Sequence, residues 1–260
     1  MEITYFLSFN RLASKSFYRM QTRMFATDDV VFLNIGYEED PPMALPLAES
    51  DEPDRFYIQL YHRTAAQADL RGKRVLEVGC GHGGGASYLM RTLRPASYTG
   101  LDRNRDAVAF CRRRHNLPKV DFVHGDAEQL PFPDQSFDAV INVESSGAYP
   151  HFSRFLAEVA RMLRPGGHFL YTDLRPRSDI AEWEAALAGA PLRMISHEDI
   201  NAQVVRGLEK NSPRMLELIG RMPMVLRRIG LEYAGMEGTG FYRAMQSGKY
   251  PYRVYCFTKD

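Results

Sequence analysis

Residues 75–85 read VLEVGCGHGGG, a short apolar run with one acid, followed by five glycines in seven positions. The apolar run predicts a buried parallel strand. The glycines lack a Cβ atom, so they permit a sharp turn and let a ligand approach the backbone. Residues 86–92 predict a helix whose N-terminus presents free N–H groups. A strand, a glycine turn and a helix in this order indicate a site of the nucleotide-binding type.

Outward from this turn, residues 71–175 alternate between predicted strands and helices. Strands are expected at 73–78, 97–101, 120–123, 138–143 and 168–172, and helices at 104–115 and 152–163. This alternation predicts a doubly wound, Rossmann-like α/β sheet with right-handed crossovers. Ligands of such sheets bind beyond the carboxyl ends of the strands. We therefore interpret residues 71–175 as a ligand-binding core.

The flanking segments predict smaller units around this core. Residues 1–70 are interpreted as an N-terminal helical lid, although the apolar stripe of 1–26 fits a helix packed on the domain equally well. Residues 176–230 predict a helical substrate cap inserted after the fifth strand. Residues 231–260 are expected to supply two closing strands, at 231–238 and 252–258. SHED at 196–199 resembles a helix-capping box, which is favoured over a metal site there.

An acid stands at or near the carboxyl end of each of the five predicted strands: Glu77, Asp102, Asp126, Glu144 and Asp173. The glycines at 79–84 also fit the dinucleotide pattern G-x-G-x-x-G, with Asp102 where a ribose-binding acid belongs. A pyrophosphate would be repelled by so many neighbouring carboxylates. A ligand with a ribose, an adenine and a cationic end fits better. S-adenosylmethionine (SAM) has all three, so we prefer it to a nicotinamide cofactor.

Several segments resemble motifs of the class I SAM-dependent methyltransferases. EVGCGHG at 77–83 looks like their motif I, and GLD at 100–102 like their second motif. Their adenine segment and their motifs at strands four and five are similar to GDAEQLPF at 125–132, FDAV at 137–140 and LRPGG at 163–167. The resemblance implies a seven-stranded sheet with its last strand antiparallel, and SAM as cofactor.

The same resemblance implies the cofactor contacts. Asp102 would bind the ribose hydroxyls, Asp126 and Ala127 would lie at the adenine, and the glycine backbone would face the methionine part. NIGY at 34–37 is similar to a segment that folds over the cofactor in sterol- and small-molecule-type members. The full expected set is Tyr37, Glu77, Gly79, Cys80, Gly81, Asp102, Arg103, Asp126, Ala127, Glu128 and Asn142.

A closer likeness extends over nearly the whole chain. It is carried by YEEDPPM at 37–43, YHRTA at 61–65, GHGGGASYL at 81–89, LEKNS at 208–212 and YCFTKD at 255–260. These segments resemble the mycobacterial phthiotriolone/phenolphthiotriolone dimycocerosate methyltransferases and their actinobacterial relatives. The resemblance implies O-methylation of a hydrophobic acceptor such as a lipid, glycolipid or polyketide.

The catalytic base is not fixed by this likeness. A neutral hydroxyl is a weak nucleophile, so its methylation usually requires a base. Related small-molecule O-methyltransferases carry a histidine where this chain has Gly147 and Ala148. His151, Asp173 and Glu144 are the remaining candidates. A carboxylate acceptor, as in a fatty acid, would need no base, and a SAM-binding protein without transferase activity is a further alternative.

The composition of the chain limits which binding partners and which cellular compartment we expect for the protein. The chain has 260 residues, 33 basic and 32 acidic side chains and a net charge of +1, so nothing points to nucleic acid. Three scattered cysteines give neither a disulfide framework nor a metal spacing, and no metal site is expected. We find no signal-peptide core and no apolar run of membrane-spanning length. These features predict a cytoplasmic protein, and they leave its oligomeric state open.

Overall fold

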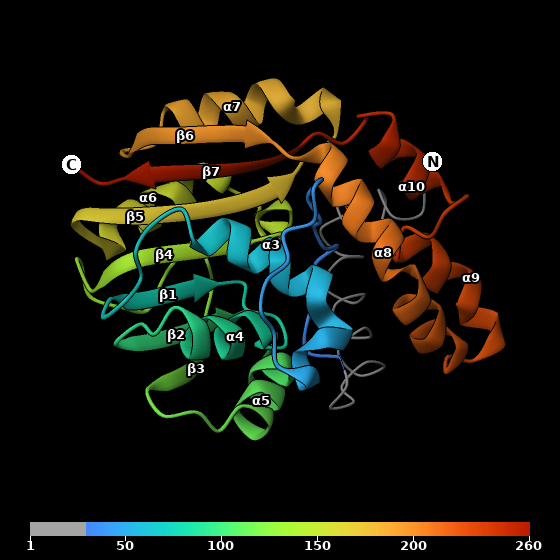
Figure 1. Ribbon diagram of the computed structural model, residues 1–260. Helices are drawn as coiled ribbons and strands as arrows, with labels where there is room; N and C mark the ends of the chain where they lie inside the picture. Colours follow the sequence, from blue (N-terminus) through green and yellow to red (C-terminus); the bar gives the residue numbers. More distant parts are fainter. Residues whose placement is uncertain (1–29) are drawn as a thin grey trace.

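The structure is a computed structural model, and it describes residues 30–260. The helix predicted at 1–26 lies outside the described residues. Seven strands form one sheet in the order β3-β2-β1-β4-β5-β7-β6 (Figure 1). Their bounds are β1 Arg74–Val78, β2 Ser97–Asp102, β3 Val120–His124, β4 Phe137–Val143, β5 Leu163–Leu174, β6 Arg193–Asp199 and β7 Tyr252–Thr258. Strand β7 runs antiparallel to both β5 and β6, as the seven-stranded prediction required.

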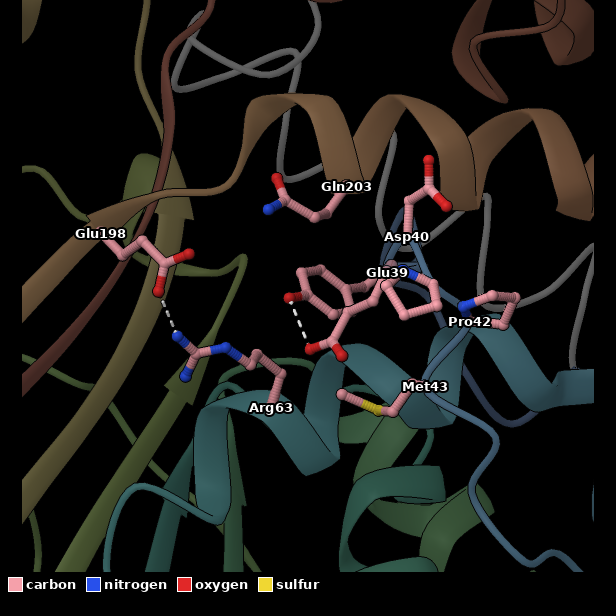
Figure 2. Close-up of a pocket in the computed structure, with 9 residues that line it drawn as sticks. Glu39, Asp40, Pro42, Met43, Arg63, Glu198 and Gln203 are labelled. Carbon is pink, nitrogen blue, oxygen red and sulfur yellow. Dashed lines mark hydrogen bonds and ion pairs between the residues drawn. The ribbon is translucent and has the colours of Figure 1, made fainter.

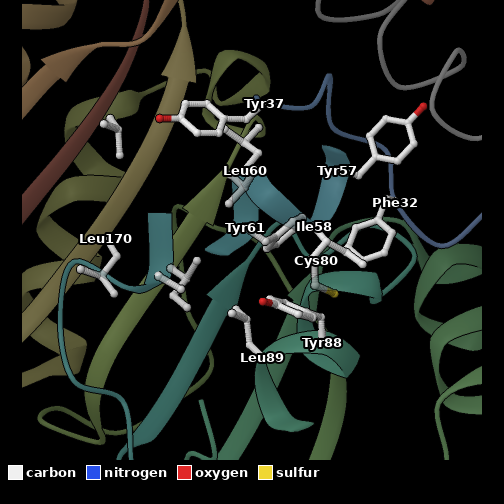
Figure 3. Packing of buried hydrophobic residues seen from close by; sticks show 14 of the residues in the cluster. Phe32, Tyr37, Tyr57, Ile58, Leu60, Tyr61, Cys80, Tyr88, Leu89 and Leu170 are labelled. Carbon is white, nitrogen blue, oxygen red and sulfur yellow. The ribbon is translucent and has the colours of Figure 1, made fainter. Parts of the chain in front are cut away.

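Helices cover both faces of this sheet because successive strand residues point to opposite sides. On β1, Val75 packs into the core beneath α3, α4 and α5, whereas Leu76 packs into the core beneath α6 and α7. Figure 3 shows part of the first core, where Leu60 and Leu89 lie close to the sheet. These helices are α3 Arg55–Ala65, α4 Gly84–Thr92, α5 Arg105–Arg114, α6 Phe152–Met162 and α7 Ile180–Ala188.

Short 3-10 turns and three further helices complete the described chain. The turns are η1 Glu49–Asp54, η2 Ser146–Ala148 and η3 Arg177–Asp179. The helices are α8 Asn201–Gly220, α9 Met224–Tyr233 and α10 Gly240–Gln246, all between β6 and β7. The arrows of the parallel strands point toward α8 in Figure 1, so α8 lies on the side of their carboxyl ends.

The sixth strand differs from the prediction. It lies at Arg193–Asp199, inside the segment expected to be wholly helical, and residues 231–238 instead end α9 and enter a turn. Every residue of β6 is exposed, so this edge strand lacks the apolar alternation that would reveal it. The capping box expected at 196–199 is likewise wrong, since His197 lies on β6 and stacks on the ring of Tyr255.

Candidate active site

The glycine turn joins β1 to α4 in a conformation that favours glycine. Gly79 and Gly81 have positive φ angles of 80° and 53°. A Cβ atom on Gly79 would overlap the side chain of Ser145, which lies directly against the turn. The backbone N–H of Gly79 donates to the carbonyl of Leu101, 2.7 Å away. Residues 79–81 thus form a turn, named the glycine cradle, between the ends of β1, β2 and β4, in which Gly79 and Gly81 are half-buried.

Asp102 ends β2 beside this cradle. Its Oδ2 accepts from the Gly81 N–H at 2.9 Å, and its Oδ1 accepts from the Asn104 N–H at 2.7 Å. Burial raises the pKa of this carboxyl above its usual range. Each carboxylate oxygen keeps a further lone pair, so Asp102 can still accept from two ribose hydroxyls. Its place and its remaining acceptors fit the predicted ribose contact.

Glu77 lies inside β1 and is fully buried. The hydroxyls of Tyr61 and Tyr98 donate to its two carboxyl oxygens, each at 2.9 Å. Burial raises the pKa of Glu77 to about 7, against the lowering effect of these two hydrogen bonds. Tyrosine partners therefore satisfy the acid of the glycine motif within the protein, and its direct contact with SAM stays a prediction.

Asn142, near the end of β4, joins the glycine turn to the loop that follows. Its amide nitrogen lies 2.9 Å from the Val78 carbonyl, 2.7 Å from Ser145 Oγ and 3.1 Å from the Tyr149 hydroxyl. Its Oδ1 is buried and has no hydrogen-bond partner among residues 30–260. A buried acceptor without a donor is costly. An ammonium group at this cradle would satisfy it, which fits the methionine end of SAM.

The predicted adenine segment lies beyond the ends of β2 and β3. Asp126 Oδ1 accepts from the Glu128 N–H at 3.0 Å, and Asp126 Oδ2 lies 4.0 Å from Arg103 Nε. Ala127 is buried beside this pair. The structure thus places Arg103, Asp126 and Ala127 at one edge of the sheet. Cys80 contributes its backbone to the neighbouring turn, while its thiol is buried.

Glu144 follows β4 and has a positive φ of 49°, which is unusual for a residue with a side chain. The N–H of Ile35 donates to both of its carboxyl oxygens, at 2.9 and 3.1 Å, and the Tyr252 hydroxyl donates at 2.5 Å. Burial raises the pKa of Glu144 to about 8, and the charge of Asp173 adds to the increase. A carboxyl with this pKa can gain and lose a proton near neutral pH.

The Asp173 carboxylate has more hydrogen-bond and ion-pair partners than the carboxyl of Glu144. Its Oδ2 accepts from the Ser146 N–H at 3.0 Å and from the Ser146 hydroxyl at 2.6 Å. Its ion-pair partner Arg175 lies 3.1 Å away and is buried between the rings of Phe152 and Trp183. These partners occupy the carboxylate, so Asp173 fixes the loop after Glu144.

His151 lies outside this group. Its Nδ1 is 2.7 Å from Glu128 Oε2, and its backbone N–H donates to Glu128 Oε1 at 2.7 Å. Its side chain is 54% exposed, and it makes no capping hydrogen bond to α6 although it stands at the N-cap. The structure therefore brings together one predicted base, His151, and one predicted cofactor residue, Glu128, at the surface.

The segment at 34–37 folds across the carboxyl ends of the strands, because Ile35 bonds to Glu144 after β4. Tyr37 itself points elsewhere. Its hydroxyl donates to Glu39 Oε1 at 3.0 Å in a polar cavity of about 430 Å³, where Arg63 pairs with Glu198 at 2.5 Å (Figure 2). The side chain of Tyr37 thus lies in a different cavity from the glycine cradle.

Sequence reasoning missed four side chains that shape this site. Ser145 and Tyr149 lie between the candidates Glu144 and His151, and their hydroxyls are 2.8 Å apart beside Gly79. Tyr252 and Arg175 carry no motif, because their roles depend on pairing between distant strands. Only the antiparallel register of β5 and β7 brings Tyr252 to this end of the sheet.

The groups at the glycine cradle fit SAM on three observations. Asp102 offers carboxylate oxygens for ribose, Asn142 Oδ1 is a buried acceptor without a donor, and Gly79 and Gly81 turn the backbone beside them with positive φ angles. Within residues 30–260, no three His, Cys, Asp or Glu side chains are grouped as metal ligands. None of the described helices has the length and apolarity needed to cross a bilayer.

Known proteins are similar to this chain in sequence. A protein-family model described as methyltransferase domain matches residues 76–171. The phthiotriol/phenolphthiotriol dimycocerosates methyltransferase of Mycobacterium tuberculosis is 59% identical over 94% of this chain and 90% of its own length. The fatty-acid O-methyltransferase of Mycolicibacterium smegmatis is 61% identical over 95% of this chain and 90% of its own length.

Solved structures show the same fold at lower identity. The cyclase SpnF has a TM-score of 0.72 and 22% identity over 96% of both chains. The geranyl diphosphate C-methyltransferase of Streptomyces coelicolor has a TM-score of 0.66 and 17% identity, over 94% of this chain and 98% of that one. By its motifs, its fold and its relatives, this chain belongs to the class I family of SAM-dependent methyltransferases.

Proposed function

We propose that this protein transfers a methyl group to a hydroxyl oxygen of a hydrophobic, lipid-type acceptor. The observation that carries the proposal is Glu144, a carboxyl with a pKa raised to about 8 that directly precedes Ser145, whose side chain packs against Gly79 of the glycine cradle. The names of the relatives from M. tuberculosis and M. smegmatis support a lipid or fatty-acyl acceptor. A polar acceptor would not match the lipid and fatty-acid acceptors in the names of these two relatives.

Helix α8 supports an apolar acceptor because of where it lies. The Asn211 amide donates to the Ile35 carbonyl at 3.1 Å, so α8 is fastened to the segment that contacts Glu144. Gly207 lets α8 approach the backbone of Tyr37 closely. The inward side of α8 carries Val204, Leu208 and Met215. We infer that a substrate cap, predicted at 176–230, extends from α8 to α10. Of the lid predicted at 1–70, we assign the covering role to the segment at 34–37, because α3 packs on the sheet.

Glu144 is the group we assign to proton removal. Bound SAM supplies a methyl carbon on a positively charged sulfur. The ionised Glu144 carboxylate accepts the hydroxyl proton of the acceptor, which makes the oxygen a stronger nucleophile. The Tyr252 hydroxyl and the Ile35 N–H hold the carboxyl in place. Asp173 and Arg175 fix Ser146 and thereby the loop that carries Glu144.

A carboxylate acceptor is the second candidate, favoured by the 61% identity to a fatty-acid O-methyltransferase. An ionised fatty acid needs no base. With a pKa of about 8, Glu144 is largely protonated at neutral pH and could donate a hydrogen bond to that acceptor. The two acceptors therefore demand opposite protonation states of the same residue.

We place the reaction in the cytoplasm. Cys80, Cys111 and Cys256 are all free and buried, which suits a reducing compartment.

The test is a competition between two acceptors that share one chain length. The enzyme is incubated with methyl-labelled SAM, a long-chain diol and the matching fatty acid. The products are then treated with alkali, which hydrolyses a methyl ester and leaves a methyl ether intact. We expect alkali-stable label in the diol. Label found only in an alkali-labile ester would replace the hydroxyl acceptor with the carboxylate.

A further inference from the structure

The far end of the α8–α9 hairpin carries an unusual apolar surface. Met224 and Val225, at the start of α9, are 81% and 82% exposed, and Leu216 on α8 is 52% exposed. We call residues 216–228 the hairpin tip. It lies on the side of the molecule away from the sheet in Figure 1, beyond the helices that cover the strand ends. Exposed large side chains grouped in this way mark an interaction surface.

Basic side chains surround the apolar pair. The hairpin tip contains three arginines, Arg221, Arg227 and Arg228, and one acid, Glu217. Glu217 pairs with Arg221 at 2.6 Å. Arg227 and Arg228 are exposed one helical turn beyond Met224 and Val225, so they lie on adjoining positions of α9. The hairpin tip thus combines an exposed apolar pair, Met224 and Val225, with excess positive charge.

We propose that the hairpin tip docks on the surface of an anionic lipid bilayer. Met224 and Val225 would enter the boundary between headgroups and acyl chains, while Arg228 would contact lipid phosphates. The Arg227 guanidinium donates to the Met222 and Gly220 carbonyls and adds its positive charge beside them. Apolar burial together with electrostatic attraction is how interfacial helices bind membranes. The excess positive charge favours anionic lipid over a second copy of this chain, which would bring like charges together.

The position of the hairpin tip relates membrane docking to delivery of the lipid acceptor. The same helix, α8, contacts the segment beside Glu144 through Asn211 at its middle and reaches the hairpin tip at its C-terminal end. A lipid leaving the bilayer at the tip could therefore reach the cap along α8. This purpose rests on the proposed lipid acceptor, whereas docking itself is measured without any acceptor.

The experiment is flotation of the full chain with vesicles of phosphatidylcholine alone or with one-third phosphatidylglycerol. We expect flotation with the anionic vesicles and at least about a fivefold weaker partition to neutral ones, since each arginine near the surface contributes roughly 1 kcal/mol. The variant Met224→Ser with Val225→Ser should lose about tenfold or more of its partition. Arg228→Glu should also weaken it and reduce its salt dependence.

The matched control changes another exposed apolar pair, Met194 and Ile195 on β6. The variant Met194→Ser with Ile195→Ser should float like the wild type, and all variants should bind S-adenosylhomocysteine unchanged. Equal losses in both double variants, or no flotation of the wild type, would overturn the proposal. A change from dimer to monomer in the Met224 and Val225 variant would assign the tip to a second copy instead. Vesicle binding without methyl transfer would refute only the proposed function.

Discussion

Replacement of Glu144 by glutamine separates its proposed chemistry from its structural contacts. The glutamine oxygen can still accept from Ile35 and Tyr252, the two partners of the carboxyl. It cannot take a proton at any working pH. Loss of a general base costs about 10²–10⁴-fold in rate. We therefore expect Glu144→Gln to lower kcat with a hydroxyl acceptor by at least about a hundredfold, with unchanged SAM affinity.

The raised pKa of Glu144 sets the expected change of the methylation rate with pH. Because the pKa of Glu144 is about 8, roughly a tenth of the carboxyl is ionised at pH 7. The wild-type rate should rise about tenfold from pH 6 to 7 and level off above pH 8. The Tyr252 hydrogen bond lowers this pKa, so Tyr252→Phe should move the rise to higher pH. A wild-type rate that falls with pH would refute the base and favour the carboxylate acceptor.

Stability provides an independent check on the same variant. The folded-state pKa of Glu144 lies above its ordinary value of 4.5, so the folded protein favours the protonated form. Its contribution to the unfolding free energy is full below about pH 4.5 and is lost as the pH rises to about 8. The Glu144→Gln protein should thus melt at a higher temperature than the wild type at pH 8.5. Lower melting at that pH would mean that the lost activity reflects damage to the fold.

Three further changes test separate parts of the site. His151→Ala should leave kcat within about threefold, because the ring pairs with Glu128 at the surface; a hundredfold loss would return the base to His151. Gly79→Ala should weaken S-adenosylhomocysteine binding at least about tenfold in calorimetry, because its φ is positive and its Cβ would overlap Ser145; unchanged affinity would contradict the cradle. Arg175→Met should cost about 3–5 kcal/mol of unfolding free energy, measured by denaturant titration, because Asp173 would be left as an unpaired buried charge; a loss below about 1 kcal/mol would contradict the buried pair.

The cofactor half of the fold could be read from the sequence because its signals are local. The run at 75–85 carries its own strand, turn and helix, and β1 and α4 lie there. The neighbouring strand β4 contains an apolar run as well, Ala139 to Ile141. Asp102, the last residue of β2, then falls beside the glycine turn by parallel pairing alone. Local pattern and sheet topology together predict most of this half.

The acceptor half depends on contacts that no local pattern carries. Strand β6 is exposed throughout, so its sequence lacks the alternation of a half-buried strand. Residues 231–238 contain short apolar pieces that fit a strand or a helix equally well; 231–233 end α9 and 234–238 form a turn. Glu144 gains its raised pKa from burial beneath Ile35 and Tyr252, both distant in sequence.

The measurement that tests the central claim most directly is calorimetric titration of S-adenosylhomocysteine into the wild type, Asp102→Ala and Glu144→Gln. Asp102 lies at the cradle through Gly81, whereas Glu144 faces Ile35 and Tyr252 on the acceptor side. We predict at least a tenfold weaker affinity for Asp102→Ala, since buried hydrogen bonds to a charged group contribute roughly 1.5–3 kcal/mol each. Glu144→Gln should bind as the wild type does. Equal affinity in all three proteins, or a loss confined to Glu144→Gln, would contradict this division of the site.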